Sequence, residues 1–496
     1  MTSKLRFYSS RGFAPTVERL LATAAGVATL TAALAFARSA AAGGLFVSER
    51  GSRPGGRAGA FIAGADDGFS VIYNPAGLVD AGTSVLLDLS YVRGTLDYTR
   101  KAPLLARDPN TGEIVRQYDQ TFPTVRGKAP FLPSPVLVGS FAITKDLVVA
   151  LGAYAPLGTL YRFPETVKGQ PAPQRYSVAN FDGSALIVTG VWLAYRPIKQ
   201  VQIGAGPTMM FGSFVNEATF GSCVPDRFIC APEQPEFDTR ARLTAGGLAA
   251  PSANFGIQVM PIDQLRIGAS FDLARTLTSQ GTLESRLPSS PLFKDASLVG
   301  DKVDLKMKLP WVARFGVEVR PGKATRIELA ATYEAWSQHD RIEAKPQNFE
   351  LRNVALFPPV YKLGDINIER RFQNSYSVKL GGEQSIPLGG VAVDARVGIG
   401  YEKSAVPNGY VSALSMDANK FIVGVGAGLH ATKHLRIDAS AMIHLHSVVE
   451  VGVDDAKIYR INPVRANAAP DGDVPVNGGK YIASTQVFSL GARYAF

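Results

Sequence analysis

The residues best suited to chemistry are bases at the polar positions of alternating segments. In Val303–Val319 the odd positions are apolar and the even positions are largely charged, and Leu435–His446 follows a similar rule. A period of two places alternate side chains on opposite faces of a β-strand. Inward-facing bases could hold a carboxylate through charge-assisted hydrogen bonds, or could pair with inward-facing acids. Among the bases on such a face, the candidates for holding a carboxylate are Lys306, Lys308, Arg314 and Arg436.

No catalytic motif accompanies these charges. The sequence contains no G-x-S-x-G, G-x-x-x-x-G-K-[ST] or H-E-x-x-H pattern. Its 52 lysines and arginines are spread along the chain and form no basic cluster interleaved with aromatic residues. We therefore expect neither an enzyme nor a partner of nucleic acid, and the pattern indicates no cofactor.

The first 42 residues predict a cleaved secretory signal peptide. Four bases within the first nineteen residues precede an apolar run from Leu20 to Ala37, and Ala40 and Ala42 form a small-residue cleavage motif. An uncleaved membrane anchor is the alternative, because about 20 apolar residues span a bilayer. The run is rich in alanine and threonine and ends in small residues, which favours cleavage and export.

Cysteines and histidines are the remaining candidate ligands. Cys223 and Cys230 are separated by six residues in GSCVPDRFIC, and such a pair in an exported chain favours a disulfide. A metal site needs more ligands than these two cysteines supply, so we expect no metal there. His444 and His446 share one strand face and could bind a metal only with a carboxylate from a neighbouring strand. We expect both to be polar lining.

Long alternating segments dominate the chain after residue 83. The alternation persists for about 9–17 residues at a time, and a transmembrane β-strand needs about 9–11. Six short turns and seven long polar loops give fourteen strands. The short turns are expected at Lys145-Asp146, Pro197 to Gln200, Pro261 to Gln264, Pro321 to Ala324, Pro387 to Gly390 and Ala431 to His434. The long loops are expected around 100–131, 157–181, 214–240, 285–302, 338–372, 405–419 and 453–480. We predict an all-β fold, a 14-stranded antiparallel transmembrane β-barrel over 83–496.

Residues 43–82 differ from the barrel in composition. Between Gly51 and Leu78 glycine occurs seven times, and two acids and two bases stand among small apolar residues. Glycine at this density makes the backbone turn often, while the large apolar side chains of the segment need burial. We predict an N-terminal hatch that plugs the barrel from inside.

The predicted hatch also carries a recognisable motif. Its residues are Gly56, Arg57, Ala58, Asp66, Asp67, Asn74, Pro75 and Ala76. Placed between a signal peptide and a β-rich chain, the motif resembles the hatch of the FadL/TodX family of outer-membrane transporters for long-chain fatty acids and aromatic hydrocarbons. In the Asn74 turn, proline fixes φ and the asparagine side chain can cap its own backbone. We expect this turn to pin the hatch to the barrel wall.

The resemblance implies passive uptake of a hydrophobic compound by loop capture, hatch movement and lateral exit beside a kinked strand. We expect the compound to be a long-chain fatty acid. An aromatic-hydrocarbon carrier, a weakly selective porin and a structural barrel whose loops bind a partner are the alternatives. Gly152 and Pro156 in LVVALGAYAPLG are the candidates for the kink. Phe163 and Phe357 are loop candidates for contact with the apolar chain.

The chain ends on an aromatic residue, Phe496, after an alternating strand. This ending resembles the signal by which barrel-assembly machinery recognises outer-membrane barrels. With the signal peptide, it implies a location in the outer membrane of a Gram-negative bacterium. We expect a monomer surrounded by outer-membrane lipid.

Overall fold

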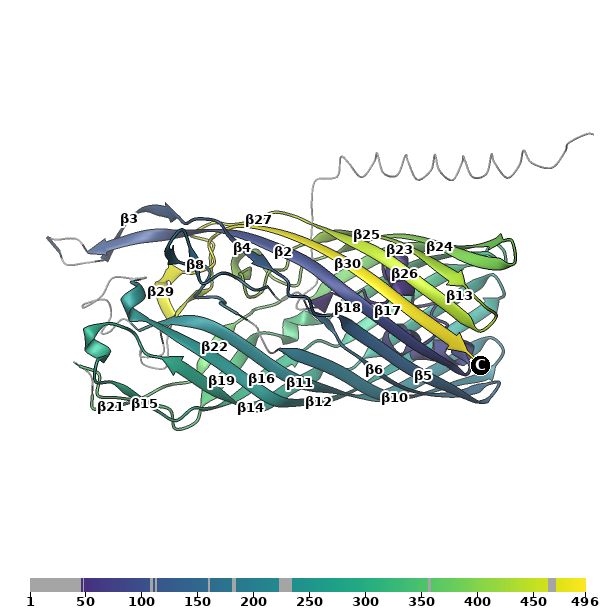
Figure 1. Cartoon of the computed structure of the whole chain (residues 1–496), viewed down its shortest axis with the longest axis horizontal. Coiled ribbons are helices and arrows are strands. Elements are labelled where there is room, and N and C mark those ends of the chain that lie inside the picture. The colour runs from purple at the N-terminus through teal and green to yellow at the C-terminus, as the bar shows by residue number, and fades with distance from the viewer. Residues whose placement is uncertain are drawn as a thin grey trace, which may run out of the picture. The chain divides into compact units, whose positions relative to one another are not determined.

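The computed structural model describes residues 46–47, 49–107, 110–111, 114–158, 161–180, 184–222, 234–355, 358–462 and 470–496. In this part of the chain most strands join one closed antiparallel barrel (Figure 1). No helix among these residues is long and apolar enough to cross a membrane. The predicted signal peptide at 1–42, the predicted disulfide Cys223–Cys230 and the candidate Phe357 lie outside the described residues.

Fourteen spans form the wall of the barrel, as the turns predicted, and β2 pairs with β30 to close it. Eight spans are single strands: β2 (Ser84–Arg107), β6 (Leu147–Tyr154), β10 (Ala185–Ile198), β11 (Val201–Gly221), β12 (Asp238–Ile262), β24 (Val391–Glu402), β25 (Lys420–His430) and β30 (Gly479–Ala495). Six spans combine two strands in line: β4 (Val125–Lys128) with β5 (Ser134–Thr144), β13 (Leu265–Asp272) with β14 (Arg275–Arg286), β16 (Lys302–Leu309) with β17 (Val312–Val319), β18 (Thr325–Glu334) with β19 (Arg341–Pro346), β22 (Ile366–Glu369) with β23 (Ser375–Leu388), and β26 (Leu435–His446) with β27 (Val449–Val451).

Shorter elements lie in the loops and, for the first of them, before the barrel begins. The strands are β1 (Phe46–Val47), β3 (Ile114–Thr121), β7 (Leu157–Gly158), β8 (Thr166–Val167), β9 (Gln170–Pro171), β15 (Ser297–Val299), β20 (Glu350–Arg352), β21 (Val360–Lys362), β28 (Tyr459–Ile461) and β29 (Pro470–Pro475). The 3-10 turns are η2 (Pro235–Phe237), η3 (Pro291–Phe293), η4 (Trp336–Gln338) and η5 (Asn408–Tyr410).

The six predicted short turns are confirmed and lie at one end of the barrel, which is the periplasmic end in barrels of this type. The predicted long loops were partly wrong. β11 and β12 stay paired from Val201↔Val259 up to Gly221↔Asp238, so much of the stretch at 214–240 is strand. Likewise β2 continues to Arg107. These extensions rise well beyond the length that a bilayer requires.

The two ends of the barrel have opposite polarity. Near the short turns large apolar side chains face outward, for example Leu137, Leu151, Leu193, Phe315, Leu329 and Leu490. Near the long loops the apolar side chains of β16 face inward: Leu305, Met307 and Leu309 are buried, whereas Lys306 and Lys308 are exposed on the outer wall. The assignment of Lys306 and Lys308 to the lumen is therefore wrong. The break at Pro310-Trp311 reverses the alternation: odd positions face inward on β16 and outward on β17. The prediction assumed one unbroken alternation from Val303 to Val319.

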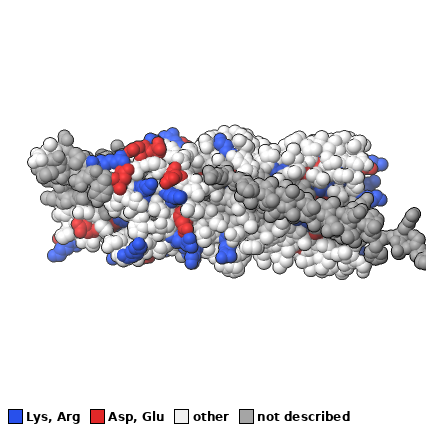
Figure 2. Space-filling model, turned by 90° about the horizontal axis from the view of Figure 1, so that it is seen from above, with Lys and Arg blue, Asp and Glu red and all other residues white. Residues whose placement is uncertain are grey.

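A row of aromatic residues marks the level of this reversal. Rings on neighbouring strands contact one another on the outer wall, with centroid distances of 5.4 Å for Phe271–Trp311 and 5.3 Å for Trp311–Tyr333. The row continues across β23, β24 and β25 through Tyr376, Tyr401 and Phe421. Aromatic girdles sit at membrane interfaces in transmembrane barrels. Figure 2 shows a broad surface with few charges between the charged part near the long loops and the short-turn end.

Residues 49–82, here named the hatch segment, lie inside the wall near the short-turn end (Figure 1). The segment contains α2 (Ser52–Gly56), α3 (Ser70–Tyr73), the 3-10 turn η1 (Pro75–Gly77) and α4 (Leu78–Ala81). Phe61, Phe69 and Leu78 are fully buried against inward side chains of the lower barrel. The large apolar residues of the segment therefore find the burial that the sequence required.

Candidate functional site: hatch, lumen cavity and wall opening

The Asn74 turn joins the hatch segment to the barrel wall. Its Nδ2 donates to the carbonyl oxygen of Ile62 (3.1 Å) and to that of Ile257 on β12 (3.1 Å). Its Oδ1 accepts from the Ala76 amide (3.2 Å), which is the capping bond expected of this turn. The side chain is fully buried, so each of these bonds replaces water that the site excludes.

Glycines on the inner wall allow the hatch backbone to approach closely. A Cβ added at Gly256 would lie 2.0 Å from Asn74 Oδ1, and one at Gly398 would lie 2.2 Å from the Arg57 carbonyl carbon. Neither contact is sterically possible, so these positions require glycine. Similar contacts occur on neighbouring strands at Gly204, Gly268, Gly316, Gly381 and Gly424. The hatch segment is thus seated against a belt of glycines around the lumen.

Arg57 ties the hatch to two inward-facing acids. Its guanidinium donates to Glu318 (3.0 Å) and Glu328 (2.9 Å), and all three side chains are fully buried. Glu328 also accepts from the backbone amides of Ile62 (2.6 Å) and Ala63 (2.9 Å). One wall carboxylate therefore holds both a hatch side chain and the hatch backbone.

The acids of the motif form a second network. Arg53 binds Asp66, Asp67 (2.9 Å) and, on wall strand β23, Glu383 (2.9 Å). Arg436, our candidate for holding a carboxylate ligand, instead donates to Asp67 (2.8 Å). Burial raises the pKa of Asp67, but Arg53 and Arg436 outweigh that effect and hold the pKa below its ordinary value. Asp67 is therefore an anion at neutral pH and anchors the hatch electrostatically.

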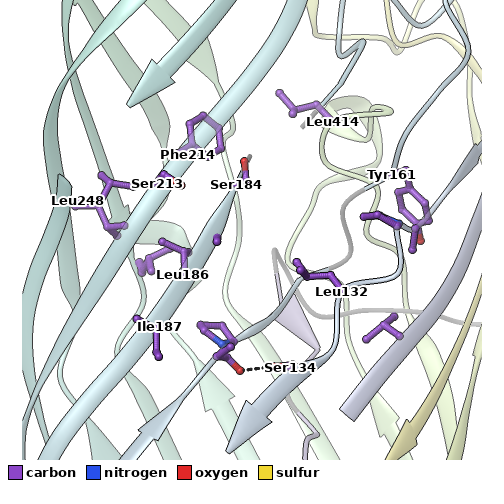
Figure 3. Close-up of a pocket in the computed structure, with 18 of the residues that line it drawn as sticks. Leu132, Ser134, Tyr161, Ser184, Leu186, Ile187, Ser213, Phe214, Leu248 and Leu414 are labelled. Carbon is purple, nitrogen blue, oxygen red and sulfur yellow. Dashed lines mark hydrogen bonds between the residues drawn. The ribbon is translucent and has the colours of Figure 1, made fainter. Parts of the chain in front are cut away.

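A cavity of about 330 Å³ lies above the hatch in the apolar part of the lumen. Figure 3 shows side chains from several strands converging on it. Its apolar lining includes Leu186, Leu248, Leu277, Met307, Leu309 and Leu414. Leu414 belongs to the loop between β24 and β25, which folds into the lumen and buries Val411 and Ala413. An apolar lining of this kind suits a hydrophobic ligand.

The cavity reaches the outer wall where the third span stops. β6 ends at Tyr154, which pairs with Val188, so among the described residues no strand pairs with Ala185–Ile187 of β10 on that side. Beside them the second span is broken between β4 and β5. The rim of this wall opening comprises Leu132, Pro133, Ala155, Pro156, Ala185 and Ile187. Leu132 is 57% exposed, so the rim presents apolar side chains outward.

The two candidates for the strand kink, Gly152 and Pro156, lie in different surroundings. Gly152 pairs regularly with Val138 and Gly190, with no register shift at that point. Pro156 follows the end of β6 and lines the opening. The break in the second span, APFLPSP at 129–135, was missed, although three prolines that each remove a backbone donor could have signalled it.

A smaller, polar cavity of about 130 Å³ lies between the apolar cavity and the hatch, and both are lined by Pro156 and Leu309. It contains Arg314, one of the candidates for holding a carboxylate, but Arg314 already donates to Asp272 (2.9 Å). Lys379 in the same cavity pairs with Glu49 of the hatch.

Two other predicted groups have structural roles. Phe163 is buried and covers Gly127, whereas its neighbour Tyr161 lines the apolar cavity. His444 faces the lumen as expected, and His446 binds the Thr485 hydroxyl (Nε2 to Oγ1, 2.9 Å). Among the described residues no group of three or more histidines, cysteines and acids could hold a metal.

These features can be compared with known proteins. A family model described as outer membrane protein transport protein (OMPP1/FadL/TodX) matches residues 33–496. The chain belongs to this family. Among solved structures, this FadL/TodX-family chain resembles a Pseudomonas aeruginosa FadL homologue, with 16% identity, a TM-score of 0.66 and coverage of 91% of this chain and 99% of the other. The P. putida toluene transporter TodX has 13% identity and a TM-score of 0.59, with coverage of 89% of this chain and 98% of the other. At these identities the likeness shows the fold alone. Curated proteins give no match.

Proposed function

We propose that this FadL/TodX-family protein carries hydrophobic compounds, first of all long-chain fatty acids, passively across the outer membrane. The observation that supports this function best is the apolar cavity, which extends from the lumen to the wall opening at Pro156 and Ala185. Its volume of about 330 Å³ falls within the range of about 300–1,000 Å³ typical of ligand pockets. The protein provides a passive route for the solute and catalyses no reaction.

Uptake begins at the long-loop end. The loop between β6 and β10 contributes buried Tyr161, and the loop between β24 and β25 contributes Leu414, so both loops bring apolar surface to the cavity. An apolar solute that leaves water at these loops enters the cavity without a polar barrier. Burial of apolar area, about 25 cal/mol per Å², drives this step.

Exit is lateral. Below the cavity the hatch segment fills the lumen, and its contacts to Ile257, Glu328 and Glu383 oppose passage straight through. The wall opening beside Pro156 and Ala185 offers a route into the lipid that never exposes the solute to water. Movement of the upper hatch residues adjusts the floor of the polar cavity, to which Arg50 and Tyr73 belong.

An aromatic hydrocarbon is the second candidate cargo. Most residues that line the apolar cavity are uncharged, so a ligand without a charge can occupy it, and similar folds include a toluene transporter. A weakly selective porin fits less well, because the hatch segment is hydrogen-bonded to the wall at several points.

The test is binding of labelled oleate to the detergent-purified barrel, with toluene as competitor, followed by oleate uptake in cells that lack their own transporter. Saturable oleate binding that toluene does not displace, together with uptake, supports a fatty-acid carrier. Displacement by toluene would favour the hydrocarbon carrier. Absence of binding for both compounds would overturn the proposed function and leave a porin or a structural barrel.

A further inference from the structure

Three neighbouring strands carry a polar groove on the outer wall, above the aromatic row. β14, β16 and β19 pair side by side there (Figure 1). The groove faces away from the lumen, because its side chains alternate along the strands with buried ones such as Leu277 and Leu305. Its volume is about 370 Å³. The outward-facing lining, here named the outer groove, comprises Thr278, Gln280, Asp304, Lys306, Glu343 and Lys345.

Lys306 and Lys308 are exposed lysines on the outward face of β16. In the described part of the chain their side chains form no ion pair and no hydrogen bond. Their cross-strand neighbours on β14 are Thr278 and Thr276, which carry hydroxyls and no charge. Ammonium groups and hydroxyls can all donate hydrogen bonds to a phosphate. This part of the wall therefore presents a set of donors that suits an anion.

The two acids of the outer groove leave these lysines available. Glu343 lies opposite Lys306 in the pairing of β16 with β19, but the two described side chains form no ion pair. Asp304 accepts a hydrogen bond from Gln347 (2.8 Å). Carboxylates beside ammonium groups suit a ligand that has both hydroxyls and an anion, because the acids accept from the hydroxyls while the lysines donate to the anion. A phosphorylated sugar has this combination.

The height of the outer groove above the membrane selects the kind of lipid. The aromatic row lies at the outer-leaflet interface, since the short turns mark the periplasmic end. Trp311 of this row follows Lys308 by three positions and Lys306 by five. With a rise of about 3.3 Å per residue and a tilt of about 40°, Lys308 lies about 8 Å and Lys306 about 13 Å above the row. A phospholipid headgroup layer is about 5–8 Å thick, so a sugar headgroup reaches Lys306 and a phospholipid headgroup does not.

We propose that the outer groove binds a phosphorylated glycolipid of the outer leaflet, the chemical class of lipopolysaccharide, through a phosphate held by Lys306 and Lys308. The threonine hydroxyls of β14 add donors to the phosphate, while Asp304 and Glu343 accept hydrogen bonds from the sugar. The acyl chains extend down the apolar outer wall, where Phe315 is exposed on β17. This site lies outside the barrel, so it is independent of the cargo that the lumen carries.

The experiment measures binding of labelled lipopolysaccharide to the detergent-purified barrel. A chelator removes divalent cations, so that no metal ion can bridge a phosphate to the acids of the outer groove. The groove variant is the double substitution Lys306→Gln with Lys308→Gln. The control, Lys199→Gln with Lys433→Gln, removes the same charge from exposed short turns at the periplasmic end. Wild type and control should bind equally, and the groove variant should bind about tenfold more weakly or worse.

Two further lipids test the chemistry. Dephosphorylated lipopolysaccharide should bind wild type about tenfold more weakly than the intact lipid. Phosphatidylglycerol reaches Lys308 at most, so the double substitution should weaken its binding less than that of lipopolysaccharide. The thermal unfolding midpoint without lipid and the binding of oleate should be the same in all three proteins, because the replaced lysines are exposed and lie outside the lumen.

Three results would overturn the proposal. One is undiminished binding of lipopolysaccharide by the groove variant, and another is equal binding of the dephosphorylated lipid by wild type. The third is an equal loss of phosphatidylglycerol binding, which would show a general anionic-lipid surface. Each of these results leaves the proposed transport function standing, because that function depends on the lumen.

Discussion

The Asn74 side chain offers the sharpest test of hatch docking. Asn74→Ala removes the donors to Ile62 and Ile257 and the acceptor of the Ala76 amide. Ile62 keeps a longer bond from Gln258 (3.3 Å), and Ile257 lies mid-strand between β11 and β13, so the group left unsatisfied is the Ala76 amide. An unsatisfied buried amide costs about 1–3 kcal/mol, which is the docking free energy expected to be lost. The undocked population should rise roughly 5- to 150-fold.

Asn74→Asp should be worse than Asn74→Ala. The carboxylate would keep the bond from Ala76 but would direct an anionic oxygen at the two carbonyl oxygens of Ile62 and Ile257. Asn367→Ala, on the exposed side of β22, is the matched control.

The assay is ion conductance of single barrels in a planar bilayer, since an undocked hatch opens the lumen to ions. Heat-modifiable migration on a gel first establishes that each variant has folded. We expect rare openings in wild type and in the Asn367 control, frequent openings for Asn74→Ala and more still for Asn74→Asp. Wild-type conductance for folded Asn74→Ala, or a milder effect of Asp than of Ala, would refute the hydrogen-bond reasoning.

Three further outcomes follow from the same contacts. Gly398→Ala should lower the unfolding temperature of the barrel, because the new Cβ would lie 2.2 Å from the Arg57 backbone, whereas Gly322→Ala, with open space around it, should not. The stability that Asp67 contributes is present above its unfolded-state pKa of about 3.9 and is lost as the pH falls through its lower folded-state pKa. Conductance should therefore be constant from about pH 7 to pH 5 and rise only below about pH 4; a rise already at pH 6 would contradict the pairing with Arg53. Lys306→Gln should leave oleate binding unchanged, because this side chain lies on the outer wall, and reduced binding would contradict that placement.

The sequence predicts most of the barrel but only part of the site. Turns such as Pro197 to Gln200 are local, so proline and polar residues between alternating runs were sufficient to place them. On β26 the alternation holds without interruption, and Arg436 and His444 face the lumen as expected. On β16 the same rule failed. A period-two pattern separates two faces but does not tell which face meets lipid, water or the lumen, and Pro310 reverses the alternation between β16 and β17.

The remaining features depend on contacts between distant segments. That Arg314 and Arg436 are already paired could not be read from their own strands, since Asp272 and Asp67 come from elsewhere in the chain.

The most direct test of the account is oleate uptake by cells that carry a barrel with a blocked wall opening. Ala185→Trp places a large side chain in the rim of the opening, and Leu193→Trp, on the lipid-facing side of the same strand, is the control. If exit is lateral, Ala185→Trp should abolish most uptake while oleate binding by the purified barrel persists, and Leu193→Trp should behave as wild type. Undiminished uptake by Ala185→Trp would contradict lateral exit and would place the route through the hatch.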